Sequence, residues 1–287
     1  MIHPIPDETS VQALTRIGAL AEHDIHPANV SQGALWLAKW TDPGLNLAPY
    51  HRHLNALVDE TRAYIADDRD DQKLVLDAAR QILARRYGYC GWSDPGEQDS
   101  CANVAHTIDN RRGNSTTLAI LYAHVLSALG CAVDYLDFAP RLLIGVNSPT
   151  GRAVLDPYDG GRLLNARALR RLLKDHHGEQ GELIPGQLHA LAPRHVWLRL
   201  HHDTKVHHLR HAAPEAAIHA IEGALLLAPD TPRLWRELGL LHARLEHIVE
   251  ASQALERYLQ LPGGDVHRYT ASQMLQQLRR RLNLGER

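Results

Sequence analysis

The stretch that decides the fold covers residues 115–129 and reads STTLAILYAHVLSAL. It is apolar almost all round, which predicts a central helix buried on every side rather than an amphipathic surface helix. Ser115 is a good N-terminal cap for this helix, and Gly130 is a good C-terminal stop. We therefore expect the core of a domain to be built around this segment.

Strand signals follow the predicted helix directly. Residues 132–138 alternate between apolar and polar side chains. Residues 141–146 read RLLIGV, and after a turn residues 152–156 are extended and apolar again. This pattern predicts a small antiparallel sheet packed on the helix.

Helical periodicity dominates the rest of the N-terminal sequence. The predicted helices are one capped by Asp7 or Ser10, and others over residues 31–40, 48–66, 71–87 and 161–174. Residues 88–102 are rich in Gly, Asp and Ser and are predicted to be a loop. Residues 178–186 contain three glycines and a proline, and mark the predicted boundary between domains at residues 1–182 and 188–287.

The C-terminal third contains an internal repeat. At a fixed offset, six residues recur as the same or a similar type: Ala217, Ala220, Ile221, Glu222, Leu225 and Leu227 match Ala251, Ala254, Leu255, Glu256, Leu259 and Leu261. Residues 235–242 read WRELGLLH, which fits the W-x2-L-G-x2-Y pattern of a tetratricopeptide repeat with His242 in the Tyr position. Two repeats are fewer than usually stand alone, so we expect them to dock on the first domain. Trp235 and His242 are candidate binding residues.

Composition excludes several classes of protein. The 287 residues carry 31 Lys and Arg against 33 Asp and Glu, which argues against a nucleic-acid binder driven by bulk charge. The sequence has neither a signal peptide pattern nor a run of 18 apolar residues, so we expect no membrane partner. Three scattered cysteines are most simply reduced thiols, which predicts a cytoplasmic protein.

Three segments carry a resemblance to a known family. They are residues 108–113 (IDNRRG), 137–143 (DFAPRLL) and 155–164 (LDPYDGGRLL). Together they resemble the bacterial SirB-like family, in which a transglutaminase-like domain precedes tetratricopeptide repeats. The resemblance covers most of the chain. It implies an α+β fold: a helix-rich, papain-like domain with a small antiparallel sheet, followed by an all-α tetratricopeptide-like domain.

The mechanism implied by this resemblance is nucleophilic. It uses a Cys at the start of the core helix, a His on the adjacent strand as base, and an Asp on the next strand that orients the His. In this chain the three positions are Ser115, Arg141 and Asp156. Asn114 and Tyr158 lie beside them in the sequence and are candidate binding residues.

Only the aspartate of that set is retained. Serine needs a neighbouring base, and arginine, with a pKa above about 12, cannot accept a proton. We therefore interpret Arg141 and Asp156 as an ion pair in which the guanidinium replaces the imidazole. A displaced nucleophile at Cys101, with His106 or His124 as its base, is the alternative.

The chain is unusually rich in histidine, with 20 residues. Five of them fall within residues 201–211, in the segment that links the two predicted domains. Four of these five are weak candidates for metal ligands: His201, His207, His208 and His211. The sequence has no H-E-x-x-H motif and no Cys pair near them, so a polar helix surface that gains charge between roughly pH 5 and 8 is the simpler interpretation.

We predict a non-catalytic binding or scaffold protein. Its partner would be a peptide or another protein, and no cofactor is expected. A cysteine- or serine-type amide hydrolase or transamidase with an atypical catalytic set is the second hypothesis, and a histidine-rich metal-binding protein is the third. The oligomeric state is not predicted.

Overall fold

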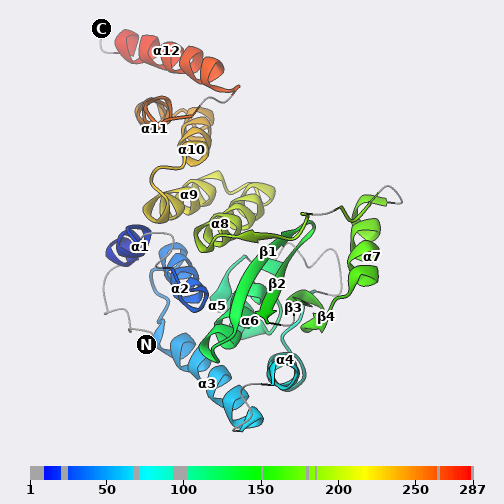
Figure 1. The fold of residues 1–287 in the computed structure, drawn as a ribbon. Helices are drawn as coiled ribbons and strands as arrows, with labels where there is room; N and C mark the ends of the chain where they lie inside the picture. The colour runs from blue at the N-terminus through cyan, green and yellow to red at the C-terminus, as the bar shows by residue number, and fades with distance from the viewer. Residues whose placement is uncertain are drawn as a thin grey trace.

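The computed structural model describes residues 10–20, 25–66, 71–92, 102–149, 151–178, 181–184, 186–263 and 266–285. Its α-helices are α1 (Ser10–Gly18), α2 (Val30–Thr41), α3 (Ala48–Ile65), α4 (Gln72–Arg80), α5 (Val104–Asn110), α6 (Ser115–Ala128), α7 (Ala166–His177), α8 (Pro193–Arg210), α9 (Pro214–Leu227), α10 (Pro232–Arg244), α11 (Ile248–Gln260) and α12 (Arg268–Gly285). Its strands are β1 (Ala132–Phe138), β2 (Arg141–Ser148), β3 (Gly151–Asp156), β4 (Arg162–Leu163) and β5 (His189–Leu191). Short 3-10 or π turns are η2 (Pro27–Asn29), η3 (Gln81–Arg86) and η5 (Pro157–Asp159). The arrangement is shown in Figure 1.

The predicted core helix is α6, and every residue from Thr116 to Ser127 is buried. Its N-cap is Asn114, not Ser115 as the sequence suggested. The Asn114 backbone is extended, and its side-chain oxygen accepts a hydrogen bond from the Thr117 amide at 2.9 Å. Ser115 is therefore the first helical residue, and its hydroxyl is available for other contacts.

The sheet is antiparallel throughout, in the order β4-β3-β2-β1-β5. Alternate residues of β2 face opposite sides, as the pleat requires. Leu142 and Ile144 join the core around α6, whereas Leu143 joins a smaller cluster with Leu169 and Leu173 of α7. The sheet thus lies between two helical layers, and the predicted α+β class is confirmed.

Two segments at the end of this unit differ from the sequence prediction. The helix expected over residues 161–174 is a short strand, β4, followed by α7, because Asn165 caps a helix that begins at Ala166. In addition, β5 pairs with β1 although it follows the predicted boundary, so residues beyond 188 complete the sheet. The division at residues 182 and 188 stays a prediction. The predicted cap Asp7 lies outside the described residues.

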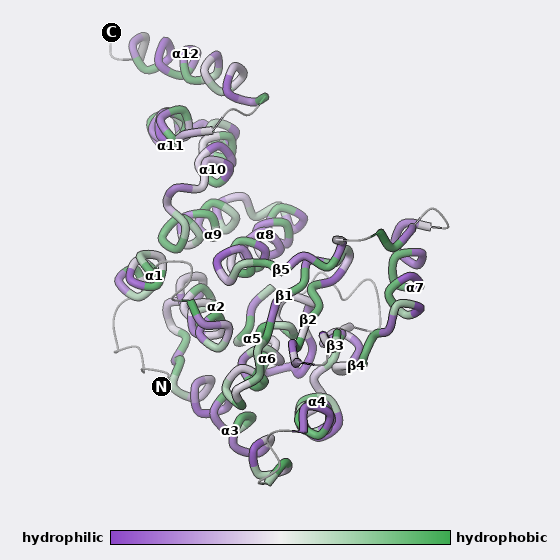
Figure 2. The backbone as a smooth tube through the Cα atoms, viewed as in Figure 1, coloured by the Kyte–Doolittle hydropathy of each residue, from purple (hydrophilic) through white to green (hydrophobic). Residues whose placement is uncertain are grey.

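Helices α8 to α12 form the repeat region, and they carry both hydrophobic and hydrophilic residues (Figure 2). Gly239 lets α10 approach α11 closely, because a Cβ there would lie 2.7 Å from the Leu255 side chain. The region docks on the N-terminal helices: the Trp197 indole donates to the Val30 carbonyl at 2.9 Å, and Trp40 stacks on His219 at 4.6 Å. None of the described helices has both the length and the hydropathy that a bilayer-spanning segment needs.

Candidate functional site

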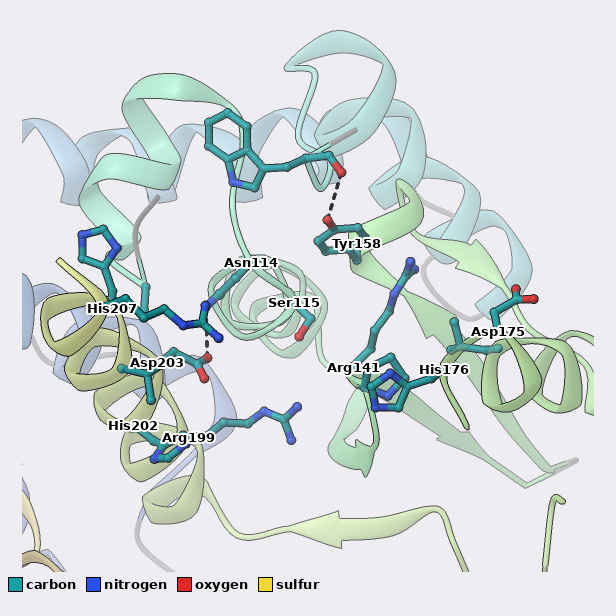
Figure 3. A pocket seen from close by; sticks show the side chains of 16 residues that line it. Asn114, Ser115, Arg141, Tyr158, Asp175, His176, Arg199, His202, Asp203 and His207 are labelled. Atoms are coloured by element: carbon teal, nitrogen blue, oxygen red, sulfur yellow. Dashed lines mark hydrogen bonds between the residues drawn. The ribbon is translucent and has the colours of Figure 1, made fainter. Parts of the chain in front are cut away.

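A cavity of about 640 Å³ lies where the start of α6 meets the sheet, α7 and α8 (Figure 3). Its lining residues come from several distant parts of the chain: Trp92, Ala102, Asn114, Ser115, Pro140, Arg141, Tyr158, Leu172, Asp175, His176, Arg199, His202, Asp203, Val206, His207 and Arg210. We call Arg141, Asp156 and Tyr158 the sheet wall, and Arg199, Asp203 and His207 of α8 the helix wall. The two walls face each other across the end of α6.

An ion pair between Arg141 and Asp156 dominates the sheet wall. Asp156 ends β3 and is completely buried, and its second oxygen accepts the Tyr158 amide at 3.0 Å. The Arg141 guanidinium also lies 4.3 Å from the centre of the Tyr158 ring, within cation–π range. Burial raises the pKa of the Asp156 carboxyl above its ordinary value, and Arg141 offsets part of that rise.

Ser115 has a structural contact rather than a catalytic partner. Its hydroxyl accepts a hydrogen bond from the Leu142 amide at 3.3 Å, which ties the start of α6 to β2. Within the described parts of the chain, no imidazole is hydrogen-bonded to Ser115 or Asp156. The position that a base would occupy beside the aspartate is filled by the Arg141 guanidinium.

The other candidate catalytic groups lie elsewhere. His124 is buried inside α6, where its Nδ1 contacts the Ser31 hydroxyl at 2.9 Å and the Ala28 carbonyl at 3.1 Å. Neither His124 nor His106 lines the cavity. Cys101 lies outside the described residues, so its predicted role as a displaced nucleophile stays a prediction.

The helix wall contains polar residues that the sequence reasoning missed. Asp203 accepts hydrogen bonds from the side-chain amide of Asn114 and from the Thr116 hydroxyl, both at 3.0 Å, and these bonds hold α8 against the start of α6. Burial raises the pKa of the Asp203 carboxyl, and the Thr116 hydrogen bond offsets part of that rise. Arg199 pairs with Asp137 of β1. The sequence does indicate that these residues lie together, because Arg199, Asp203 and His207 are spaced at i, i+4 and i+8 and such residues share one face of a helix.

The four predicted metal candidates do not converge. His201 is buried toward α2 and α9, beside Ala34 and Ala220, and burial lowers its pKa to about 4. His207 lines the large cavity on another face of α8, and its ring lies 4.3 Å from that of His211. His208, also on α8, has its pKa lowered by burial. Over the ranges that the structure describes, no group of three or more His, Cys, Asp or Glu side chains could hold a metal ion.

The candidate binding residues divide between two places. Asn114 and Tyr158 lie at the cavity with Ser115 and Arg141. Trp235 and His242 lie on α10 in the repeat region, away from the cavity. The Trp235 indole donates to the Pro229 carbonyl at 2.7 Å, and His242 is buried with its Nδ1 3.3 Å from that of His247. Both therefore contact neighbouring repeat residues.

A second polar cluster lies between α3 and the turn before α6. His53 Nε2 is 2.7 Å from the Tyr89 hydroxyl and 2.9 Å from the Arg111 guanidinium. Arg111 donates, so Nε2 is an acceptor and the ring is neutral. Burial and the Arg111 charge lower the pKa of His53 to about 4, and Arg111 itself has a left-handed backbone with φ of 60°. This cluster shapes the turn that leads into Asn114.

Comparison with known families agrees with this architecture. A model of the transglutaminase-like superfamily matches residues 48–202, and a tetratricopeptide repeat model matches residues 205–279. The fold is that of a transglutaminase-like domain joined to repeat helices. The chain belongs to the transglutaminase-like superfamily, and its resemblance to the SirB-like family is confirmed.

Individual relatives are similar over most of their length. A UPF0162 protein of Xylella fastidiosa (strain 9a5c) is 26% identical over 246 residues, which cover 85% of this chain and 87% of that protein. A UPF0162 protein of Vibrio cholerae is 24% identical over 231 residues, with 79% and 84% covered. A crystal structure of menin matches at a TM-score of 0.39 with 10% identity, covering 90% of this chain and 71% of menin.

Proposed function

We propose that this chain is a non-catalytic protein that binds a peptide segment of a protein partner in the cavity between the sheet wall and the helix wall. The observation that carries the proposal is the Arg141–Asp156 pair, because a guanidinium occupies the place of the general base. Arginine does not release its proton in proteins, so Ser115 has no group to activate it there. Reduced Cys90 and Cys131 fit a cytoplasmic protein.

Features of the cavity support binding. It is large enough for several side chains of a peptide and is lined by aromatic, polar and charged groups that are already held in place. Tyr158 is fixed by its stacking on Arg141 and by the hydrogen bond from its hydroxyl to the Trp92 carbonyl at 2.9 Å. The repeat helices next to α8 provide a second surface, and tetratricopeptide repeats generally mediate protein–protein contacts.

The test of non-catalysis is covalent labelling of the native chain. A fluorophosphonate probes Ser115, and a peptidyl vinyl sulfone probes the three thiols. We expect peptide mapping to find no modification of the wild type above that of the heat-denatured chain. Saturable labelling of Ser115, or of any cysteine, in the native protein would contradict the proposal and favour the hydrolase hypothesis.

A matched variant shows that the labelling test is able to detect catalysis in this fold. Ser115→Cys combined with Arg141→His restores the residue types that the mechanism requires at these two positions. We expect this double variant to react with the vinyl sulfone at position 115, whereas Ser115→Cys alone reacts much more slowly because Asp156 still pairs with Arg141. Equal rates for the two variants would show that Arg141 does not block the base position.

A further inference from the structure

We infer that the cavity recognises a carboxylate of the bound peptide, held between Arg141 of the sheet wall and Arg199 of the helix wall. This inference rests on the proposed function and specifies the ligand chemistry of the same site. Arg199 points into the cavity from α8, and Arg141 stands on the opposite side (Figure 3). Both side chains are 25% exposed, so each guanidinium is accessible from the cavity.

Arg141 is oriented before any ligand arrives. One of its terminal nitrogens donates to Asp156, and its guanidinium lies 4.3 Å from the centre of the Tyr158 ring. A guanidinium has five N–H donors in a fixed fork. Among the described residues Asp156 is the only hydrogen-bond acceptor that Arg141 contacts. Donors therefore remain on a side chain that has already lost its rotational freedom.

Arg199 has the same organisation on the opposite wall. One terminal nitrogen donates to Asp137 of β1, and no other acceptor contacts it within the described parts of the chain. The two guanidinium groups are already oriented and face the same cavity, and their N–H donors match the planar oxygens of a carboxylate, which only accept hydrogen bonds. A neutral amide presents one acceptor oxygen and two N–H groups, and neither guanidinium has an acceptor for these N–H groups.

The two carboxylates that line the cavity are only partly engaged by protein groups. One Asp203 oxygen accepts from both Asn114 and Thr116, and Asp175 lies 3.9 Å from Arg171 on α7. Arg141 and Arg199 supply the charged donors to a ligand, and among the described residues the second Asp203 oxygen remains an acceptor. Arg141 pairs with Asp156, and Arg199 pairs with Asp137 and also lowers the pKa of Asp203. The residual positive charge is therefore small, which favours a singly charged carboxylate over a doubly charged phosphate.

The experiment uses the full-length chain and random hexapeptide libraries in two arms, one with free C-terminal carboxylates and one with C-terminal amides. We expect selected peptides to require either an internal Asp or Glu or the free C-terminus, and the two arms show which source is used. The best peptide is then measured by fluorescence anisotropy. Replacing its essential carboxylate by an amide should weaken binding at least about tenfold, as should Arg199→Gln in the protein.

Control variants separate this inference from the proposed function. Arg62→Gln removes an arginine paired with Asp59 on α3, outside the cavity, and should leave the affinity unchanged. Val206→Trp fills the cavity from the helix wall and should abolish binding.

The remaining outcomes are decisive. A peptide that binds equally well with a carboxylate or an amide at that position, and that no longer binds to the Val206→Trp variant, would overturn the carboxylate inference and leave the proposed function standing. A preference of tenfold or more for phosphoserine over Glu would also overturn it. If no library peptide binds in a manner sensitive to Val206→Trp, both proposals are wrong.

Discussion

The two walls of the cavity contain the same kind of ion pair in different surroundings. Asp156 of the sheet wall has a side chain that is 0% exposed, whereas Asp137, which pairs with Arg199 of the helix wall, is 50% exposed. The two arginines have equal exposure. The difference therefore lies in how much each carboxylate depends on its guanidinium, and it separates a pair required for the fold from a pair that the fold does not require.

The physical reason is desolvation. A carboxylate moved into the interior loses its hydration, and only a close cation together with further hydrogen bonds compensates for that loss. Asp156 has Arg141 and the Tyr158 amide for this purpose. Asp137 keeps much of its water, so its pair contributes as surface ion pairs do, at most about 1 kcal/mol.

Removal of Arg141 should have the largest effect on stability. Arg141→Ala leaves the buried Asp156 charge unpaired, and we expect the free energy of unfolding to fall by about 3 kcal/mol. Urea denaturation followed by circular dichroism measures this. Adding Asp156→Asn to Arg141→Ala should recover part of the loss, since no buried charge then remains. Stability of Arg141→Ala within 1 kcal/mol of the wild type would show that water reaches Asp156 and that the two walls do not differ.

The second prediction concerns acid and the opposite face of α8. The pKa of His201 is lowered by burial to about 4, whereas an unfolded chain titrates near 6.5. Between these values the unfolded state binds the proton and the folded state does not, so stability is complete above about pH 6.5 and falls as the pH drops toward 4. At pH 5 the loss from this residue should be about 2 kcal/mol.

A variant pair isolates the contribution of His201. His201→Leu should flatten the dependence of unfolding free energy on pH between 6.5 and 4.5. His177→Leu removes an exposed histidine and should leave that dependence unchanged. An identical slope for wild type and His201→Leu would mean that His201 gains a proton in the folded state as readily as in the unfolded chain.

Local patterns in the sequence were sufficient for much of the fold. The apolar run from residue 115 to 129 identified α6, because a helix buried on all sides needs no polar stripe. Residues 155–164 located Asp156 at the end of β3 and identified the family. The tetratricopeptide pattern at residues 235–242 identified α10. In each case the information lies in neighbouring residues.

Features that depend on distant contacts were not predictable in this way. The three-residue strand β5 is too short to show alternation, and only its pairing with β1 makes it a strand. Asn114 and Ser115 are both good caps, and the choice depends on which backbone is extended. The spacing of Arg199 and Asp203 places both on one face of a helix, but only the docking of α8 on α6 turns that face toward the cavity.

The third prediction tests how the helix wall is fastened. Asp203→Ala leaves the Asn114 amide and the Thr116 hydroxyl without their acceptor, and we expect a loss of about 1 to 2 kcal/mol in unfolding free energy. Asp203→Asn keeps one acceptor oxygen and should lose less. If the two variants are equally stable, the hydrogen bonds to Asp203 do not hold α8 against α6.

The smallest effect on stability is expected for Arg199. Because Asp137 is half exposed, Arg199→Ala should change the unfolding free energy by less than about 1 kcal/mol, and Asp137→Ala should do the same. The same Arg199→Ala variant should nevertheless lose at least about tenfold in peptide affinity, whereas Asp137→Ala, which frees another donor of Arg199, should retain binding. If both variants are nearly as stable as the wild type but only Arg199→Ala loses peptide affinity, then Arg199 binds the peptide and Asp137 does not.

A loss of several kcal/mol in the unfolding free energy of Arg199→Ala would instead show that Arg199, like Arg141, is required for the fold. The distinction between the two walls would then be wrong.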